Sequence, residues 1–221
     1  MDILQAIEER HSVRKYEDKA LPDDVVDALR KEVDECNAES GLHLQLVTNE
    51  PEAFGSAIPH FGRFTGVTNY IALIGKADPD LDELLGYYGE RLVLKAQMLG
   101  LNSCWVALTF KKVPSAYEVA PGEKLSGVIA IGYGKTQGHP HRSKNIYTVS
   151  NLTEDSPDWF RKGVEAALLA PTAMNQQRFH IDLVGSNARA TAGVGIYARL
   201  DLGIVKYHFE IGSGKDSTIW L

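Results

Sequence analysis

The sequence changes from helix to strand at Ala170-Pro171-Thr172-Ala173-Met174-Asn175-Gln176-Gln177. Residues 165–170 are strong helix formers, and Pro171 ends the helix because it disfavours helical angles in the residue before it. Residues 179–184 then alternate in polarity, which predicts a strand. We therefore predict a polar turn whose side-chain amides and backbone N–H groups can face a ligand. The alternative is an ordinary connection between a helix and a strand.

A second polar motif follows a short helix that we expect Asp2 to cap. Arg10, Ser12 and Arg14 alternate with other side chains, so in extended backbone they lie on one side of the chain. Guanidinium groups match phosphate oxygens bidentately, which makes this side a candidate phosphate site. The alternative is a solvated basic run after a helix.

Composition limits the function classes. The chain has 221 residues, 44% of them hydrophobic, and a net charge of −6 without a polybasic tract, so we expect no nucleic-acid or membrane partner. Cys36 and Cys104 lack zinc-ligand spacing and are predicted to be free thiols in a reducing compartment. No apolar run approaches the ~20 residues of a membrane span. These features predict a cytoplasmic protein with no metal site.

Both polar motifs resemble motifs of the nitroreductase family of FMN-dependent oxidoreductases. The turn is similar to A-P-S-x-x-N-x-Q-P-W, with Arg178-Phe179 in place of Pro-Trp, and residues 10–16 are similar to R-x-S-x-R-x-[FY]. A third stretch, Leu101-Asn102-Ser103-Cys104-Trp105-Val106-Ala107, resembles the family's G-L-G-T-C-W-V-G-G segment. In that family the turn lies near the N-terminus and usually reaches the flavin from the neighbouring subunit, whereas here it lies in the C-terminal half.

The resemblance implies an FMN site with four groups of residues. The first group holds the phosphate and the ribityl chain, the second presents backbone N–H groups to flavin N5, the third returns basic side chains to the phosphate, and the fourth is the turn. In that order, the implied cofactor-binding residues are Arg10, His11, Ser12 and Arg14; Val106, Ala107 and Leu108; Arg142 and Lys144; and Pro171, Thr172, Ala173, Asn175 and Gln177. Leu108 stands where the family usually has glycine. Cys104 is predicted to pack in the core rather than to act as a nucleophile.

Apolar periodicity predicts the remaining elements. The expected helices are 21–36, 81–99, 160–170 and 201–212, and the expected strands are 42–46, 70–74, 128–132 and 179–184. Residues 37–41 are expected to break the second helix and to replace a flavin-lining turn with one that carries Glu39. Residues 50–69 read as a loop, in which Phe61 and Phe64 are candidate substrate contacts or, alternatively, anchors to the core.

The second half of the chain repeats the first in weakened form. The segment around the turn corresponds to residues 26–47, the helix 201–212 to the helix that ends at Gly100, and residues 215–221 to residues 101–107. We therefore expect one α+β nitroreductase-like domain over residues 1–221, with a mixed, mostly antiparallel sheet packed by helices and fused halves of about 1–150 and 151–221. Each motif occurs once, so we expect one flavin per chain and a monomer that acts as a single-chain pseudodimer.

The implied function is that of an FMN-dependent oxidoreductase that takes electrons from NADH or NADPH and reduces small electrophiles such as nitroaromatics or quinones. Flavin N5 carries the hydride in such enzymes, so no side chain is assigned as catalytic acid or base. Two alternatives stay open: another flavin reaction on the same fold, such as reductive dehalogenation, and a non-enzymatic flavin-binding or redox-sensing protein.

Overall fold

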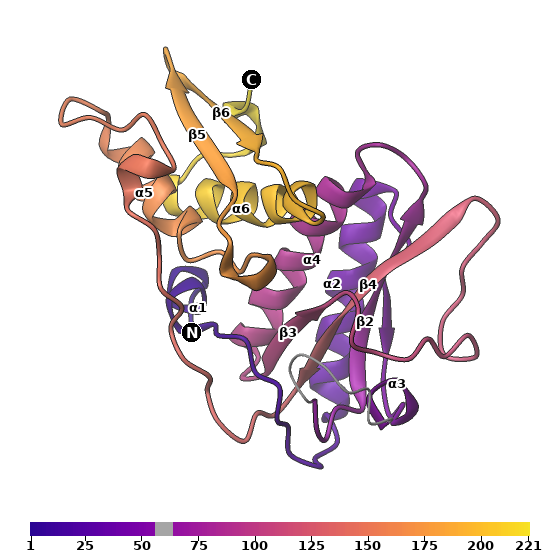
Figure 1. Cartoon of the computed structure of the whole chain (residues 1–221). Helices are drawn as coiled ribbons and strands as arrows, with labels where there is room; N and C mark the ends of the chain where they lie inside the picture. Colours follow the sequence, from indigo (N-terminus) through magenta and orange to yellow (C-terminus); the bar gives the residue numbers. More distant parts are fainter. Residues whose placement is uncertain (56–63) are drawn as a thin grey trace. The chain divides into compact units, whose positions relative to one another are not determined.

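The computed structural model describes residues 1–55 and 64–221. The chain forms two compact units, each built from separate stretches of sequence (Figure 1). Unit 1 comprises Met1–Glu8, Asp82–Arg91 and Pro140–Leu221, and unit 2 comprises Glu9–Leu81 and Leu92–His139. Helix α4 (Leu81–Met98) contributes its first half to unit 1 and its second half to unit 2.

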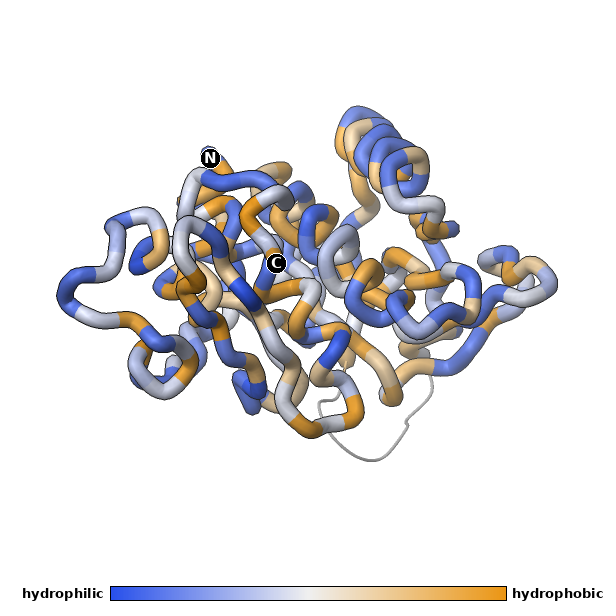
Figure 2. The backbone as a smooth tube through the Cα atoms, turned by 90° about the horizontal axis from the view of Figure 1, so that it is seen from above, coloured by the Kyte–Doolittle hydropathy of each residue, from blue (hydrophilic) through white to orange (hydrophobic). Residues whose placement is uncertain are grey.

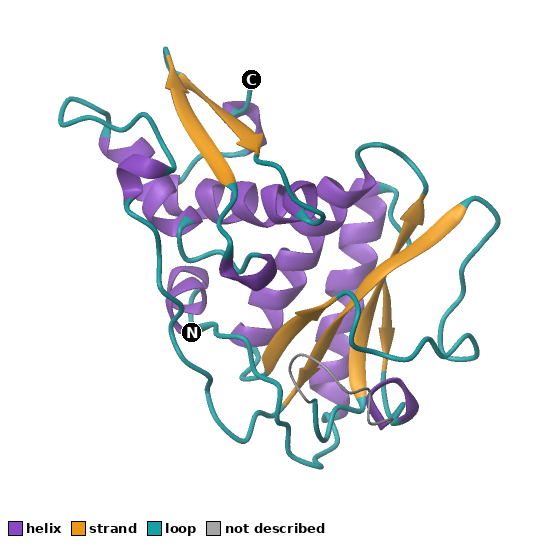
Figure 3. Ribbon diagram, viewed as in Figure 1, coloured by secondary structure: helices purple, strands orange, loops and turns teal. Residues whose placement is uncertain are grey.

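Unit 2 is built on an antiparallel sheet. Its described strands, which are among the orange arrows of Figure 3, are β1 (Gln45–Val47), β2 (Asn69–Lys76), β3 (Asn102–Val106) and β4 (Glu123–Gly132). Hydrogen-bonded neighbours follow the order β1-β2-β4-β3. Helix α2 (Asp23–Ser40) and the short helix α3 (Glu52–Gly55) belong to the same unit. The predicted strands at 70–74 and 128–132 and the helix at 81–99 are confirmed.

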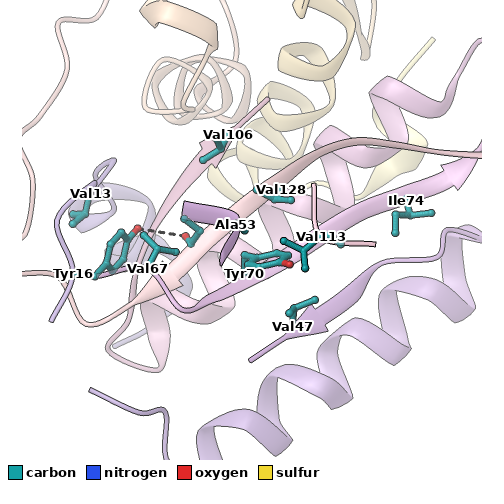
Figure 4. Close-up of a cluster of buried hydrophobic side chains, with 12 residues drawn as sticks. Val13, Tyr16, Val47, Ala53, Val67, Tyr70, Ile74, Val106, Val113 and Val128 are labelled. Atoms are coloured by element: carbon teal, nitrogen blue, oxygen red, sulfur yellow. Dashed lines mark hydrogen bonds between the residues drawn. The ribbon is translucent and has the colours of Figure 1, made fainter. Parts of the chain in front are cut away.

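The core of unit 2 explains why these strands read as continuous apolar runs. Strand β2 is buried from Asn69 to Gly75, as expected of a strand that is covered on both faces. Side chains from β1, β2, β3 and β4 meet Val13 and Tyr16 in one hydrophobic cluster (Figure 4). The buried Tyr16 hydroxyl donates a hydrogen bond of 3.4 Å to the Ala130 carbonyl oxygen of β4, which fixes the N-terminal segment to the sheet.

The predicted break at residues 37–41 is wrong. Helix α2 continues to Ser40 and ends at Gly41, whose φ of 71° is the left-handed conformation that glycine adopts readily. Asn37, which we expected to break the helix, instead bonds with both side-chain groups to the backbone of Leu44. Glu39 therefore lies on a helix and not in a turn, and the strand that follows is shorter than expected, from Gln45 to Val47.

Unit 1 combines helices with a β-hairpin. Its elements are α1 (Ile3–Glu9, with Glu9 in unit 2), α5 (Asp158–Ala167), α6 (Ala198–Ser213), the hairpin β5 (Phe179–Val184) and β6 (Asn187–Ala192), and the 3₁₀ turns η1 (Ile146–Thr148), η2 (Ala173–Asn175) and η3 (Ser217–Ile219). Asp2 caps α1 as predicted, since its Oδ1 accepts the Gln5 N–H at 2.9 Å. Ala6 and Ile7 are the buried residues of this helix, and Leu4 is exposed.

Two features of unit 1 differ from the prediction. Strand β6 was not predicted; it pairs with β5 across a tight turn in which Gly185 has a φ of 63°. The expected echo of residues 101–107 at 215–221 is not a strand, because Asp216 caps the 3₁₀ turn η3 there. This end contacts β6 through an isolated bridge between Trp220 and Ala188 and through the Asn187 side chain, whose Nδ2 donates to the Ile219 carbonyl oxygen at 3.2 Å.

Glycines allow the helices of unit 1 to approach closely. A Cβ on Gly203 of α6 would lie 2.0 Å from the Glu83 carbonyl oxygen of α4, and a Cβ on Gly86 of α4 would lie 2.0 Å from the Leu200 carbonyl oxygen of α6. Helix α6 therefore packs closely on the first half of α4.

Hydropathy alternates along the chain, as the mixture of blue and orange segments in Figure 2 shows. Among the described residues, none of the helices has the length and apolar character that crossing a membrane requires.

Candidate functional site

The Arg10–Arg14 motif lies beside strand β3 in unit 2. Ser12 forms a parallel bridge with Ser103, and the Val13 N–H donates to the Ser103 carbonyl oxygen at 3.0 Å. The segment is thus extended, as the alternating pattern requires. Buried Val13 faces the core cluster, whereas Arg14 is exposed.

Three side chains of this motif gather around the Cys104 thiol of β3. Burial raises the pKa of Cys104, while the charge of Arg14, a hydrogen bond from Ser12 and the charge of Arg10 act in the opposite direction and lower it. The structure therefore brings together the two guanidinium groups and the hydroxyl that the sequence placed on one side. The net rise in pKa keeps the buried thiol protonated, which fits a core position better than a nucleophile.

The loop after β4 contacts this motif. Gly138 has a φ of 74°, and a Cβ there would lie 2.7 Å from His11 Cβ, so the loop contacts His11 directly. Buried Asn102 holds the loop in place: its Oδ1 accepts the Gly134 N–H at 2.9 Å, and its Nδ2 donates to Gln137 Oε1 at 2.9 Å. Sequence reasoning missed Asn102, although a polar residue at the start of a buried strand is a usable signal.

The segment predicted to approach flavin N5 lies at the end of the same strand. Val106 is the last residue of β3 and is buried, and Ala107 and Leu108 form the bend that follows. Leu108, which replaces the usual glycine, is 78% exposed. Its side chain therefore projects from the bend rather than packing in the core. The Arg10–Arg14 motif thus runs beside strand β3, and this bend lies at the end of the same strand.

The other predicted residues lie in unit 1, where the turn and the basic segment meet. Buried Gln177 donates from Nε2 to the Arg142 carbonyl oxygen at 2.8 Å and accepts the Lys144 N–H on Oε1 at 2.8 Å. Lys144 Nζ donates to the Gln177 carbonyl oxygen at 2.9 Å, and Asn175 Nδ2 donates to the Arg142 carbonyl oxygen at 2.9 Å. Gln177 thus positions the segment that carries both predicted basic side chains, and those side chains are exposed.

The start of the turn is held by a residue that the sequence did not single out. Asp201 of α6 is 4% exposed, and its carboxylate oxygens lie 3.0 and 3.1 Å from the Ala173 nitrogen, which donates to them. Burial raises the pKa of Asp201 to about 6, against the opposing effect of the Ala173 N–H. Nearby, Thr172 Oγ1 accepts the Gln177 N–H at 3.0 Å.

The candidate substrate contacts have separate outcomes. Phe61 lies outside the described residues. Phe64 packs against the core cluster of unit 2, with its ring centroid 5.1 Å from that of Phe54, which favours the alternative that it anchors the loop. Within the described part of the chain, His, Cys, Asp and Glu side chains do not gather in threes as a metal ion would need.

Comparison with known proteins gives a consistent result over most of the chain. Residues 2–213 match the family described as "Putative TM nitroreductase". A protein of Methanothermobacter thermautotrophicus described as "Putative NADH dehydrogenase/NAD(P)H nitroreductase" is 26% identical over 121 residues, which are 49% of this chain and 62% of that protein. The matched region therefore spans less than two thirds of this relative.

Solved structures support the fold. The chain is similar to a "putative nitroreductase" of Thermotoga maritima, with a TM-score of 0.68 and 24% identity over 96% of this chain and 83% of the other. It is also similar to a "putative nitroreductase in complex with fmn" from Desulfovibrio desulfuricans, with a TM-score of 0.53 and 19% identity over 71% and 99% of the two chains. The predicted nitroreductase-like α+β fold is confirmed, and because the family match extends from residue 2 to residue 213, the chain belongs to this nitroreductase family.

Proposed function

We propose that the protein is an FMN-dependent oxidoreductase that uses NADH or NADPH to reduce small electrophiles such as nitroaromatics or quinones. One observation carries the proposal: Arg10, Ser12 and Arg14 converge on Cys104 in a segment that runs beside β3. The bend Val106–Leu108 ends the same strand. The D. desulfuricans relative in complex with FMN supports the choice of cofactor.

The residues of unit 2 fit a phosphate monoester. Two permanently charged guanidinium groups and a hydroxyl supply hydrogen-bond donors, and charge-assisted bonds of this kind are the strong ones. Their positive potential already acts on the Cys104 thiol, whose pKa burial raises and these groups lower. A dianion would be stabilised by the same potential. His11, held by the bond between its Nδ1 and the Arg10 carbonyl oxygen at 2.8 Å, is positioned beside them.

When bound, FMN would supply the hydride chemistry, and the chain's own residues would bind and orient it. Arg10, His11, Ser12 and Arg14 are assigned to the phosphate and ribityl chain, and the backbone N–H groups of Val106, Ala107 and Leu108 to the flavin ring. The residues of unit 1 keep, as a separate proposal, the roles that the family resemblance gives them: Arg142, Lys144, Pro171, Thr172, Ala173, Asn175 and Gln177.

We also propose that one chain binds one FMN as a monomer of two fused halves. The close packing of α6 on the first half of α4 supports this, because Gly86 and Gly203 bury surface within the chain that two chains would otherwise bury between them. Light scattering on FMN-loaded protein, with the flavin released per mole of chain, tests the proposal. A dimer that loses FMN on dilution would contradict it.

Anaerobic reduction is the test of the enzymatic function. Purified protein with bound FMN is mixed with NADH or NADPH, and loss of the oxidised flavin absorbance is followed before a panel of nitroaromatics and quinones is added. We expect reduction by at least one nucleotide and reoxidation by an organic acceptor. If neither nucleotide reduces the bound FMN, the result would contradict the proposed oxidoreductase activity. It would favour a non-enzymatic flavin-binding or redox-sensing protein.

A further inference from the structure

The turn of unit 1 has an unfavourable backbone that must be held in place. Met174, Asn175 and Gln177 have φ angles of 51°, 54° and 46°, in the left-handed region that side chains with a Cβ rarely adopt. Such residues persist where the surrounding structure over-determines them, and they cluster at functional sites. Gln177 fixes the end of the turn through Arg142 and Lys144.

Asp201 fixes the start of the same turn. Both of its carboxylate oxygens accept the Ala173 N–H, the residue directly before the left-handed pair. The carboxylate is almost fully buried and lies in the first turn of α6, where the helix dipole favours an anion. The turn is thus held by a carboxylate at one end and an amide side chain at the other.

The carboxylate is an unexpected choice for a merely structural contact. Burial raises the pKa of Asp201 to about 6, so its ionised form at neutral pH is less favourable here than in water. A neutral amide has an oxygen that accepts the same N–H without a buried charge. A charge that opposes folding but orders a turn with a strained backbone is typical of a functional position.

Charged groups on the neighbouring elements are engaged with each other. Glu83 of α4 pairs with Arg199 and Lys206 of α6, and Lys144 bonds to Gln177. Exposed Arg142 is the other charge on the segment bound to the turn. Burial raises the pKa of Asp201, and the Ala173 N–H lowers it.

We propose that Asp201 is a positioning residue for the flavin-lining turn, and that its ionised form holds Ala173 in the conformation that binds FMN. The inference rests on the proposed role of the turn in FMN binding. Asp201 acts through the Ala173 backbone and does not itself touch the cofactor. Protonation weakens its bond to the N–H, because charged acceptors form stronger hydrogen bonds than neutral ones.

The test compares Asp201→Asn with wild type and with Asp155→Asn, which changes an exposed carboxylate in the same unit. FMN dissociation constants are measured by fluorescence quenching at pH 7.5 and pH 5. We expect Asp201→Asn to bind FMN about 5- to 10-fold more weakly than wild type at pH 7.5, the difference between a charged and a neutral hydrogen bond. The ratio of variant to wild type should approach 1 at pH 5. Because it is a ratio, the phosphate's own titration near pH 6 cancels.

A second measurement needs no cofactor. Hydrogen exchange at the Ala173 amide in FMN-free protein should be several-fold faster in Asp201→Asn than in wild type at pH 7.5, while the thermal midpoint does not fall. If wild type binds FMN and Asp201→Asn binds it equally tightly, the positioning role is overturned. A lower thermal midpoint in Asp201→Asn, together with a ratio of affinities that does not change with pH, would also overturn it. Failure of the wild type itself to bind FMN is a different result, since it would overturn the proposed function together with this inference.

Discussion

Gly203→Ala tests the helix packing on which the single-chain arrangement depends. A Cβ at this position would lie 2.0 Å from the Glu83 carbonyl oxygen and 2.7 Å from the Tyr87 nitrogen. Both neighbours are backbone atoms of α4, so no side chain can rotate away, and α6 must move by about 1.4 Å to reach an ordinary contact near 3.4 Å.

The magnitude follows from two opposing effects. Overpacking against rigid backbone costs about 3 kcal/mol, the upper part of the usual range. Alanine favours the helix over glycine by about 1 kcal/mol. The expected net loss in the free energy of unfolding is therefore about 2 kcal/mol, which corresponds to a decrease of about 4–8 °C in Tm for a chain of this size.

Urea denaturation and thermal unfolding followed by circular dichroism measure this loss. Gly214→Ala serves as the comparison, because a Cβ there meets no atom within 4 Å and only the left-handed φ of 66° opposes it. That variant should lose about 1–2 kcal/mol without any change in helix packing. If Gly203→Ala were as stable as wild type, α6 would not approach α4 at this point, and the argument for burial within one chain would fail.

Three further predictions concern the site. Arg14→Ala should weaken FMN binding by about 1.5–3 kcal/mol in a titration and riboflavin binding by much less, with exposed Arg30→Ala of the same unit as the control; equal losses for both ligands would mean that Arg14 only supports the fold. The pKa of Asp201 is about 6 in the folded protein, against 3.8 for an ordinary aspartate, so the free energy of unfolding should fall by up to about 3 kcal/mol as pH rises from about 4 to 6. Urea titrations across this range should show the fall in wild type but not in Asp201→Asn. The same pH dependence in both proteins would contradict the prediction. Leu108→Gly restores the residue that is usual in the family, and because Leu108 is 78% exposed it should speed flavin reduction by NAD(P)H in stopped-flow traces with little effect on Tm; an unchanged rate would remove the side chain from the approach to the flavin.

Local sequence signals predicted much of the fold. The apolar runs at 70–74 and 128–132 became the central strands, and the helix at 81–99 was correct to within one residue. The errors came from side chains that satisfy the backbone in unforeseen ways. Asn37 reads as a helix breaker, yet it bonds to Leu44 and lets α2 continue to Ser40.

The candidate site was predicted in part for a similar reason. Alternation in an extended segment placed Arg10, Ser12 and Arg14 together, and that grouping depends only on local geometry. Asp201 and Asn102 act through contacts with segments about 30 residues away in the sequence, and neither has a local pattern that marks it. The glycines of the α4–α6 contact were not recognised as packing residues either, because their role depends on which helices meet.

Titration of the wild-type protein with FMN and riboflavin tests the central claim most directly. If the residues around Cys104 hold the cofactor phosphate, FMN fluorescence should be quenched saturably with one equivalent per chain, and FMN should bind at least tenfold more tightly than riboflavin. Fluorescence that stays unquenched at saturating FMN, or equal affinities for the two flavins, would contradict the assignment of Arg10, Ser12 and Arg14 as the phosphate site.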